Sequence, residues 1–428
     1  MNSERKPHLA PASHFASAQT TLPTLVTCFV LLCVQLLPEV PVYLGVASSF
    51  SVGTTIAAAA TSIFILIFLY IHKSRHSTTL LDSGAFGIIL IIIILTAICS
   101  QAVLANSILP INKIRLIESI VPLAFLLSAG LAIAAVFRLS SPYQLDISAR
   151  TSFWVLIGVS ALSIFHLEPP GTFLAHPTFP FTETSHLALV LGPIFIYRCA
   201  VCHRSYSIFW ILFGLALGVL LKSATLVVFV FGGALIARRL AFACMITLIP
   251  LAAGAATHLS YFTSRADISS HSSSISALVY LQGWEFLVKS IQETNGIGVG
   301  FQQLGIHSLH LPVTELIRIA NGGGALNQYD GSFLFSKIGS EFGIFGLLLV
   351  ALYCWQGVKV IHQLRRRSTP STLILSQCIF IGFAVDLFIR GMGYFSGATL
   401  LFIGALFSFN FSPFRNSIVD SPISSSLQ

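Results

Sequence analysis

The feature that most constrains this chain is the recurrence of apolar runs, each close to 20 residues long, along most of its 428 residues. A helix rises about 1.5 Å per residue, so such a run crosses the roughly 30 Å hydrocarbon core of a bilayer. The runs are apolar on both faces, which fits helices rather than barrel strands. Only 9% of the residues are charged, too few to cover a soluble surface of this size, since soluble domains average about 25%. The sequence therefore predicts an all-α, polytopic integral membrane protein.

We expect about twelve membrane-spanning helices. Their approximate ranges are 22–45, 50–72, 84–109, 116–138, 151–167, 186–201, 206–221, 223–237, 240–258, 333–358, 372–389 and 395–411. The short neighbours 206–221 and 223–237 are also compatible with a re-entrant pair. The expected organisation is a cytoplasmic tail over 1–21, a membrane domain over 22–411 and a second cytoplasmic tail over 412–428.

The distribution of charge predicts the orientation, because Lys and Arg concentrate on the cytoplasmic side of membrane helices. With the N-terminus inside, most of the 23 Lys and Arg fall in inner segments, namely Arg5, Lys6, Lys73, Arg75, Arg138, Arg150, Arg198, Arg204, Arg238, Arg239, Lys359, Arg365, Arg366, Arg367 and Arg415. This pattern favours both termini inside, with outer loops at about 166–185 and about 259–333. It also accounts for the net charge of +8 without a nucleic-acid partner.

Charge and glycine are unusually dense in residues 261–337, which we call the polar island. Outer Lys and Arg side chains oppose the orientation rule, and they suit either pairing with local acids or binding an anionic lipid-linked diphosphate. Amides, phenols and carboxylates bind sugar hydroxyls, and aromatic rings stack on sugar faces. The candidates for substrate binding are Lys222 outside the island and Arg265, Trp284, Glu285, Arg318, Gln328, Tyr329, Asp330 and Lys337 within it. Ordinary interfacial polarity, including a Lys337–Glu341 pair at i,i+4, is the structural alternative.

A second group of polar residues, Thr182-Glu183-Thr184-Ser185-His186, lies where the first outer loop enters a span. In a helix, Glu183 and His186 share a face, and a carboxylate–imidazole pair at the membrane edge suits proton transfer. The alternative is that the Ser and Thr side chains cap the helix. Arg390, placed after an apolar span, completes the candidate catalytic set of Glu183, His186 and Arg390.

Three further patterns are weak functional signals. Gly296-Ile-Gly298-Val-Gly300 lacks the strand–helix context of a phosphate loop, and we interpret it as a tight turn that requires positive φ or close backbone approach. Cys199-Ala-Val-Cys202-His203 matches a haem-attachment pattern, but the predicted orientation places it inside. His307 and His310 lack the spacing of metal ligands. We expect neither a metal nor a cofactor.

Taken together, these motifs resemble the O-antigen polymerase/ligase superfamily, which consists of multi-span glycosyltransferases of the GT-C type. The resemblance rests on the Glu-x-Ser-His turn, the Gly296–Phe301 motif in a late outer loop, and Asn327-Gln-Tyr-Asp-Gly-Ser332 before the Glu341-Phe-Gly-Ile-Phe-Gly-Leu-Leu span. The chain is most similar to repeat-unit polymerases of the Wzy type. Many of these have proline where this chain has Thr184.

The resemblance implies transfer of a growing glycan from undecaprenyl diphosphate onto a lipid-linked acceptor, at the outer face of a bacterial inner membrane. In that reaction Arg265 and Arg390 would hold the diphosphate, with Lys222 and Lys337 as weaker candidates. Glu183 or His186 would take the proton of the acceptor hydroxyl. The implied partners are the lipid-linked glycan, the bilayer and a protein that regulates chain length.

Two other functions fit the same pattern. A ligase would move the finished glycan to a different acceptor. A flippase or exporter would place its polar sites near the bilayer midplane, often on broken helices in two related halves. Because the polar residues concentrate in one late outer loop, an enzyme is favoured over a transporter.

Overall fold

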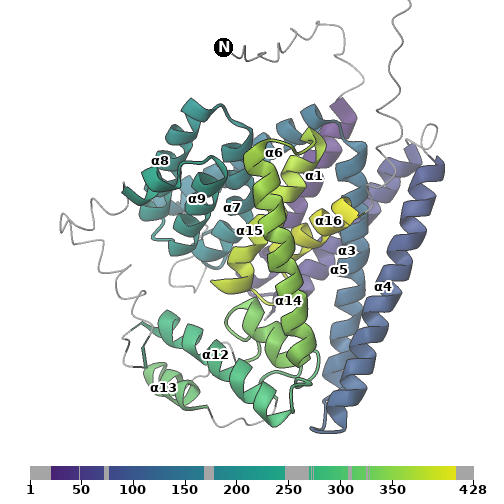
Figure 1. The fold of residues 1–428 in the computed structure, drawn as a ribbon, viewed down its shortest axis with the longest axis vertical. Helices are drawn as coiled ribbons and strands as arrows, with labels where there is room; N and C mark the ends of the chain where they lie inside the picture. The colour runs from purple at the N-terminus through teal and green to yellow at the C-terminus, as the bar shows by residue number, and fades with distance from the viewer. Residues whose placement is uncertain are drawn as a thin grey trace, which may run out of the picture.

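The computed structural model of this chain describes residues 21–47, 49–71, 77–167, 178–245, 269–270, 272, 274–306, 311–323, 326 and 328–410. Within these ranges the regular secondary structure is helical. The single β-type contact there is an isolated bridge between Thr178 and Phe181. The predicted all-α fold class is confirmed. Figure 1 shows the helices gathered into one bundle, with α12 and α13 below its main body.

The helices follow the predicted apolar runs. They are α1 Thr21–Leu36, α2 Val40–Tyr43, α3 Phe50–Ile71, α4 Ser77–Asn106, α5 Lys113–Leu139, α6 Pro142–Ile164, α7 Thr184–Val201, α8 Arg204–Leu220, α9 Ala224–Ile236, α12 Ile275–Glu293, α13 Pro312–Ala320, α14 Leu334–Arg366, α15 Ile374–Phe388 and α16 Gly397–Asn410, with a 3-10 turn at Ser371–Leu373. Helices occupy eleven of the twelve expected spans. The remaining span, 240–258, lies mostly outside the described residues.

Six of these helices are long and apolar enough to cross a membrane: residues 86–106 of α4, then α5, α6, α7, α14, and α15 with its 3-10 turn. Five further apolar helices, in α1, α3, α8, α9 and α16, are shorter. At 13 residues, α9 is about 20 Å long, which is less than the hydrocarbon thickness. Long apolar helices fit a protein embedded in a membrane, whereas the number of twelve spans and the orientation stay predictions.

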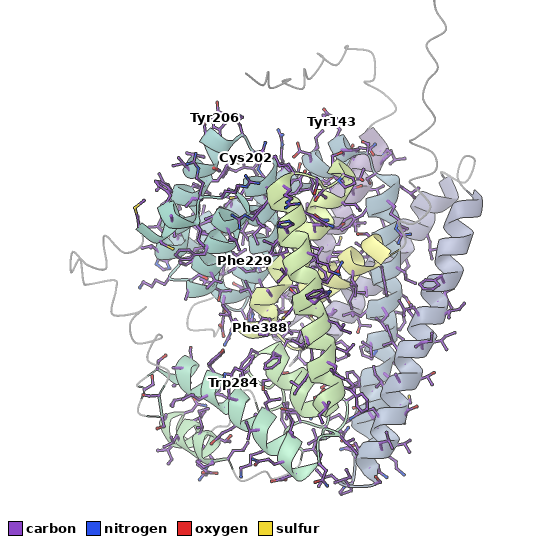
Figure 2. All side chains as sticks on the ribbon, in the orientation of Figure 1. Tyr143, Cys202, Tyr206, Phe229, Trp284 and Phe388 are labelled. Atoms are coloured by element: carbon purple, nitrogen blue, oxygen red, sulfur yellow. The ribbon has the colours of Figure 1, made fainter. Side chains whose placement is uncertain are left out.

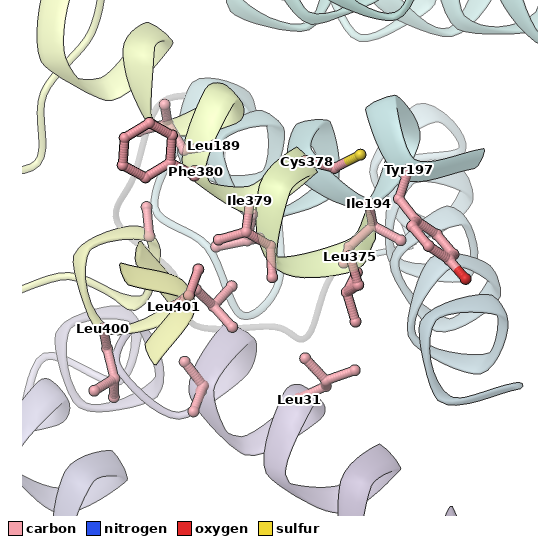
Figure 3. Packing of buried hydrophobic residues seen from close by; sticks show 14 of the residues in the cluster. Leu31, Leu189, Ile194, Tyr197, Leu375, Cys378, Ile379, Phe380, Leu400 and Leu401 are labelled. Carbon is pink, nitrogen blue, oxygen red and sulfur yellow. The ribbon is translucent and has the colours of Figure 1, made fainter. Parts of the chain in front are cut away.

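Helix α7 forms the centre of the bundle, while α4 and α14 lie at its edge. In the most apolar window of each helix, 78% of α7 is buried, compared with 17% of α4 and of α14. Figure 3 shows the packing of α7 against α15, with side chains such as Ile194 and Ile379 beside Leu401 of α16 and Leu31 of α1. A Cβ atom at Gly192 of α7 would lie 2.1 Å from the Phe229 ring, so α9 reaches α7 because this residue has no side chain.

Basic side chains connect the helix ends at one side of the bundle. Asp146 near the start of α6 pairs with Arg150 at 2.7 Å and contacts Arg198 near the end of α7 at 3.9 Å. Arg238, after α9, donates to the carbonyl of Arg365 near the end of α14 at 2.7 Å. We call this side the basic end. Figure 2 places the labelled Tyr143, Cys202 and Tyr206 on this side and Trp284 on the opposite one.

The described part of the polar island contains helices α12 and α13 and the first turn of α14. Its helix α12 packs against α13 and against the start of α14. Helix α14 itself is interrupted at Gly343, where φ is 59° and ψ is −137°. The 23 residues after this break, 344–366, extend about 35 Å and are sufficient to span a bilayer. The span predicted at 333–358 is therefore two segments, and Lys337 and Glu341 lie in the shorter first segment.

The break in α14 is held by the glycine turn of the island. Val299 and Gly300 donate their backbone N–H groups to the carbonyls of Ser340 and Glu341 at 2.9 Å, and Ile344 donates to Gly296 at 2.8 Å. The predicted positive φ is confirmed, with 86° at Gly298. A Cβ there would lie 2.5 Å from the Glu341 carbonyl oxygen. The glycines thus allow the turn to satisfy backbone groups that the interrupted helix leaves unpaired.

We expect Gly298→Ala to lower stability by about 2 kcal/mol or more, because it adds a steric clash to the strain of positive φ. Thermal unfolding in detergent measures the effect. Gly322→Ala is the matched control, since Gly322 has φ +63° and a Cβ there would meet no atom within 4 Å. An equal loss in both variants would show that the close contact at Gly298 contributes nothing.

Candidate functional site

Two candidate catalytic residues from distant parts of the sequence form an ion pair. Arg390 Nη2 donates to Glu183 Oε2 at 2.8 Å, and the Ser185 hydroxyl donates to the same oxygen at 2.8 Å. The Glu183 side chain is 53% exposed and that of Arg390 is 23% exposed. Arg390 Nε makes no hydrogen bond within the described part of the chain. Both side chains of the pair are thus partly exposed, although Nε of Arg390 is itself buried.

His186 has a different set of contacts from Glu183. Its Nδ1 lies 2.7 Å from the Thr182 hydroxyl and 3.7 Å from Glu39 Oε2, and its ring meets Phe50 edge to face. Glu183 precedes α7 in an extended conformation. The expectation that Glu183 and His186 share a helical face is therefore wrong. The two residues are still neighbours, because the His186 backbone N–H donates to the Glu183 carbonyl at 3.1 Å.

A second polar cluster surrounds Lys337, whose side chain is only 1% exposed. Its ammonium group donates to the Tyr329 carbonyl at 2.7 Å, lies 3.6 Å from Asp330 Oδ1 and sits over the Tyr394 ring at 5.2 Å. The guanidinium of Arg115 stacks on the Tyr329 ring at 4.5 Å. Three predicted binding residues, Tyr329, Asp330 and Lys337, thus come together.

Glu341 lies behind this cluster and is fully buried. The i,i+4 pair with Lys337 that the sequence suggested does not form within 4 Å, because Lys337 turns to Tyr329 and Asp330. Neither Glu341 carboxylate oxygen makes a hydrogen bond of good geometry with the described residues. Burial and the facing Glu341 carboxylate raise the pKa of Tyr394 well above its usual range, so this phenol stays protonated and available as a donor.

One short segment, 389–396, connects the two clusters. Arg390 belongs to the first cluster and Tyr394 to the second. Between them, the Gly391 N–H approaches the Ser332 carbonyl at 3.4 Å, and a Cβ at Gly393 would lie 3.5 Å from Asp330 Oδ1. The predicted catalytic residues and three of the predicted binding residues, Tyr329, Asp330 and Lys337, are thus adjacent parts of one region, on the side of the bundle away from the basic end.

Other predicted binding residues lie elsewhere or have structural contacts. Lys222 is exposed in the turn between α8 and α9. Arg318 pairs with Glu315 at 2.9 Å on an exposed face of α13, and Glu285 accepts the Val313 N–H at the start of α13. Gln328 donates to the Gly305 carbonyl at 3.2 Å.

Trp284, 40% exposed, packs on Phe333 and Phe335. Arg265 lies outside the described residues, as do His307 and His310. Within the described ranges, no three His, Cys, Asp or Glu side chains gather in the manner of a metal site.

Sequence reasoning missed three residues of this region: Glu39, Arg115 and Tyr394. Glu39 carried a signal, because a carboxylate inside an apolar run is costly and often functional, and the predicted span 22–45 contains it. Tyr394 lies four residues after the predicted catalytic residue Arg390. Arg115 lies at the start of α5, and its contact with the Tyr329 ring is evident only from the three-dimensional structure.

Comparison with known proteins gives no further guide. No protein-family model, no curated protein and no solved structure matches this chain. Any assignment of function therefore rests on the residues and their geometry.

We expect Lys337→Met not to lower the melting temperature in detergent. Burying the ammonium group costs several kcal/mol, which is about as large as the gain from its charged hydrogen bond, about 1.5–3 kcal/mol. Loss of Lys337 also leaves Asp330 solvated, because the Asp330 side chain is 60% exposed. Phe333→Ala serves as the comparison, since Phe333 is fully buried and its truncation costs about 3–5 kcal/mol. A loss for Lys337→Met as large as that for Phe333→Ala would show that Lys337 is retained for stability.

Proposed function

We propose that this protein is a membrane glycosyltransferase that polymerises undecaprenyl-diphosphate-linked oligosaccharide units at the outer face of the bacterial inner membrane. The observation that carries the proposal is the accessible Arg390–Glu183 pair beside His186. A guanidinium suits a diphosphate, and a carboxylate and an imidazole suit proton transfer. These groups come together at one side of an apolar bundle, where a lipid-linked substrate presents its head group.

The proposed reaction uses three groups in distinct roles. Arg390 binds the diphosphate of the donor through the exposed part of its side chain and offsets the charge that develops as this group leaves. Glu183 or His186 takes the proton of the acceptor hydroxyl. The hydroxyl oxygen then bonds to the anomeric carbon, the bond between that carbon and the diphosphate oxygen breaks, and undecaprenyl diphosphate departs. The diphosphate is a good leaving group without further activation.

The second cluster suits recognition of sugar rings. Tyr329 and Asp330 are 49% and 60% exposed, so their phenol and carboxylate are accessible to sugar hydroxyls, and the exposed Trp284 offers an aromatic face. Lys337 is too buried to contact a ligand directly, and its contact with Asp330 instead orients that carboxylate. We assign this second cluster to binding of the acceptor unit, because the cluster adjoins segment 389–396, which contains Arg390.

A transporter is the second candidate, since α14 is broken beside the buried Glu341, and broken helices with ionisable groups are typical of transporters. The position of the break favours the enzyme. Nine residues precede Gly343 in α14 and 23 follow it, so a complete span lies on one side of the break. The cluster then belongs at a membrane edge, where a transferase acts, instead of at the midplane.

Reconstitution tests the proposal with purified protein in liposomes that contain a lipid-linked oligosaccharide. We expect a ladder of products, with at least about 100-fold lower rates for Arg390→Ala and for one of His186→Ala and Glu183→Gln, because charge stabilisation and proton transfer each contribute about that much. Glu183→Gln separates the two candidate bases, since only one of Glu183 and His186 takes the proton.

Arg366→Ala is the control variant, because Arg366 is exposed at the basic end and its loss leaves the rate unchanged. Transfer to a different lipid acceptor without a ladder would replace polymerase by ligase. Movement of the intact lipid across the bilayer without transfer would overturn the enzyme in favour of the transporter. Normal product length and rate in all three site variants would remove the site assignment.

A further inference from the structure

We propose that Glu39, in the turn between α1 and α2, is a positioning residue for His186 and identifies His186, rather than Glu183, as the base. This inference rests on the proposed function. Glu39 belongs to none of the sequence motifs, and its contact with His186 distinguishes the role of His186 from that of Glu183.

Glu39 and His186 form a buried contact between distant parts of the chain. Their side chains are 3% and 8% exposed, and Glu39 Oε2 lies 3.7 Å from His186 Nδ1. Oε2 accepts no hydrogen bond within the described part of the chain. A carboxylate without a partner in an apolar interior is costly. The contact with His186 is the one ion-pair contact found for Glu39 in the described ranges, so the imidazole is the ionisable group that this carboxylate faces.

The backbone fixes the position of Glu39. Its N–H donates to Leu36 at 3.2 Å, and its carbonyl accepts from Tyr43 at 2.9 Å, which closes the short helix α2. Pro38 precedes it, and α3 approaches so closely that a Cβ at Gly53 would lie 2.1 Å from the Pro38 carbonyl oxygen. The carboxylate is therefore presented to His186 by a tightly packed turn.

The ring of His186 is held at one nitrogen. Thr182 and Glu39 both approach Nδ1, Phe50 packs against the ring, and no described residue bonds to Nε2. When Nδ1 carries the hydrogen, Nε2 has a free lone pair for the acceptor proton. The carboxylate then stabilises the imidazolium that forms, as a buried acid does in a Ser-His-Asp triad.

Glu183 has a different environment. Its carboxylate is shared between Arg390 and Ser185 and is half exposed, which suits orientation of the Arg390 guanidinium. Charged and titratable groups on the elements that pack around the start of α7 include Glu39, the Glu183–Arg390 pair, the buried phenol of Tyr43 and the buried Asp386 of α15, which accepts the Met392 N–H. Of these, Glu39 is the one in ion-pair contact with the ring.

Glu39→Gln in the reconstituted assay tests the inference. We expect kcat to fall at least about 10-fold with KM unchanged, because Glu39 acts through His186 and does not contact substrate. Glu39→Asp restores part of the rate. Glu293→Gln, which makes the same change on an exposed face of α12, leaves the rate as in the wild type.

A second measurement does not depend on turnover. Nitrogen shifts of isotope-labelled histidine, assigned with His186→Gln, report which ring nitrogen carries hydrogen at alkaline pH. We expect Nδ1–H in the wild-type protein and loss of that preference in Glu39→Met. An unchanged tautomer in Glu39→Met, or an unchanged kcat in Glu39→Gln, overturns the inference. If the wild-type protein makes no product, the proposed function fails, and the tautomer alone decides whether Glu39 positions His186. If the Glu39 variants do not fold, Nε2–H in the wild-type protein overturns the inference and Nδ1–H supports it.

Discussion

The arrangement of the polar region depends on the backbone hydrogen bonds that replace the helical ladder at the break in α14. In an apolar bundle every unpaired carbonyl or N–H is costly, so a helix can be interrupted only where other backbone groups take over. The turn at Gly296–Gly300 supplies them. Gln101 of α4 adds a side-chain donor to the Glu341 carbonyl at 2.8 Å. The break is therefore a fixed feature that orients the first segment of α14 and, with it, Lys337.

Gln303, just after the glycine turn, connects this turn to α5. The side chain of Gln303 accepts the Asn112 N–H at 2.7 Å, which ties the glycine turn to the start of α5. That contact brings Arg115 to Tyr329. On the other side, segment 389–396 joins the island to the start of α7 through Arg390 and Glu183. The polar residues thus form a continuous region between rigid helices, although they come from five separate stretches of sequence.

The apolar runs predict most of the helices correctly, because hydropathy acts locally and a span needs only length and composition. The fold of the island was harder to predict. Helix α12 is amphipathic and held by packing on α13 and α14, so its existence depends on contacts that a linear reading does not contain. The glycine spacing correctly indicated positive φ at Gly298, but the partner of the turn, a break in a helix 45 residues later, could not be inferred from it.

The candidate site shows the same division. The sequence indicates Glu183 through its neighbour His186 and Arg390 through its place after an apolar span, and their pairing across 207 residues emerges only from the fold. Residue type alone predicts Glu285 as a sugar-binding residue, whereas in the structure its carboxylate accepts the Val313 N–H at the start of α13. Residue chemistry predicts which side chains suit a reaction, whereas the geometry decides which of them are still available for it.

Segment 389–396 also sets a length scale. Arg390 and Tyr394 are four residues apart, so their Cα atoms are separated by at most about 14 Å of extended chain. In the proposed reaction this stretch of backbone sets the distance between Arg390, which binds the leaving diphosphate, and the cluster around Lys337, which binds the incoming sugar. Lengthening it by one residue would move the two substrates out of register without altering a single contacting side chain.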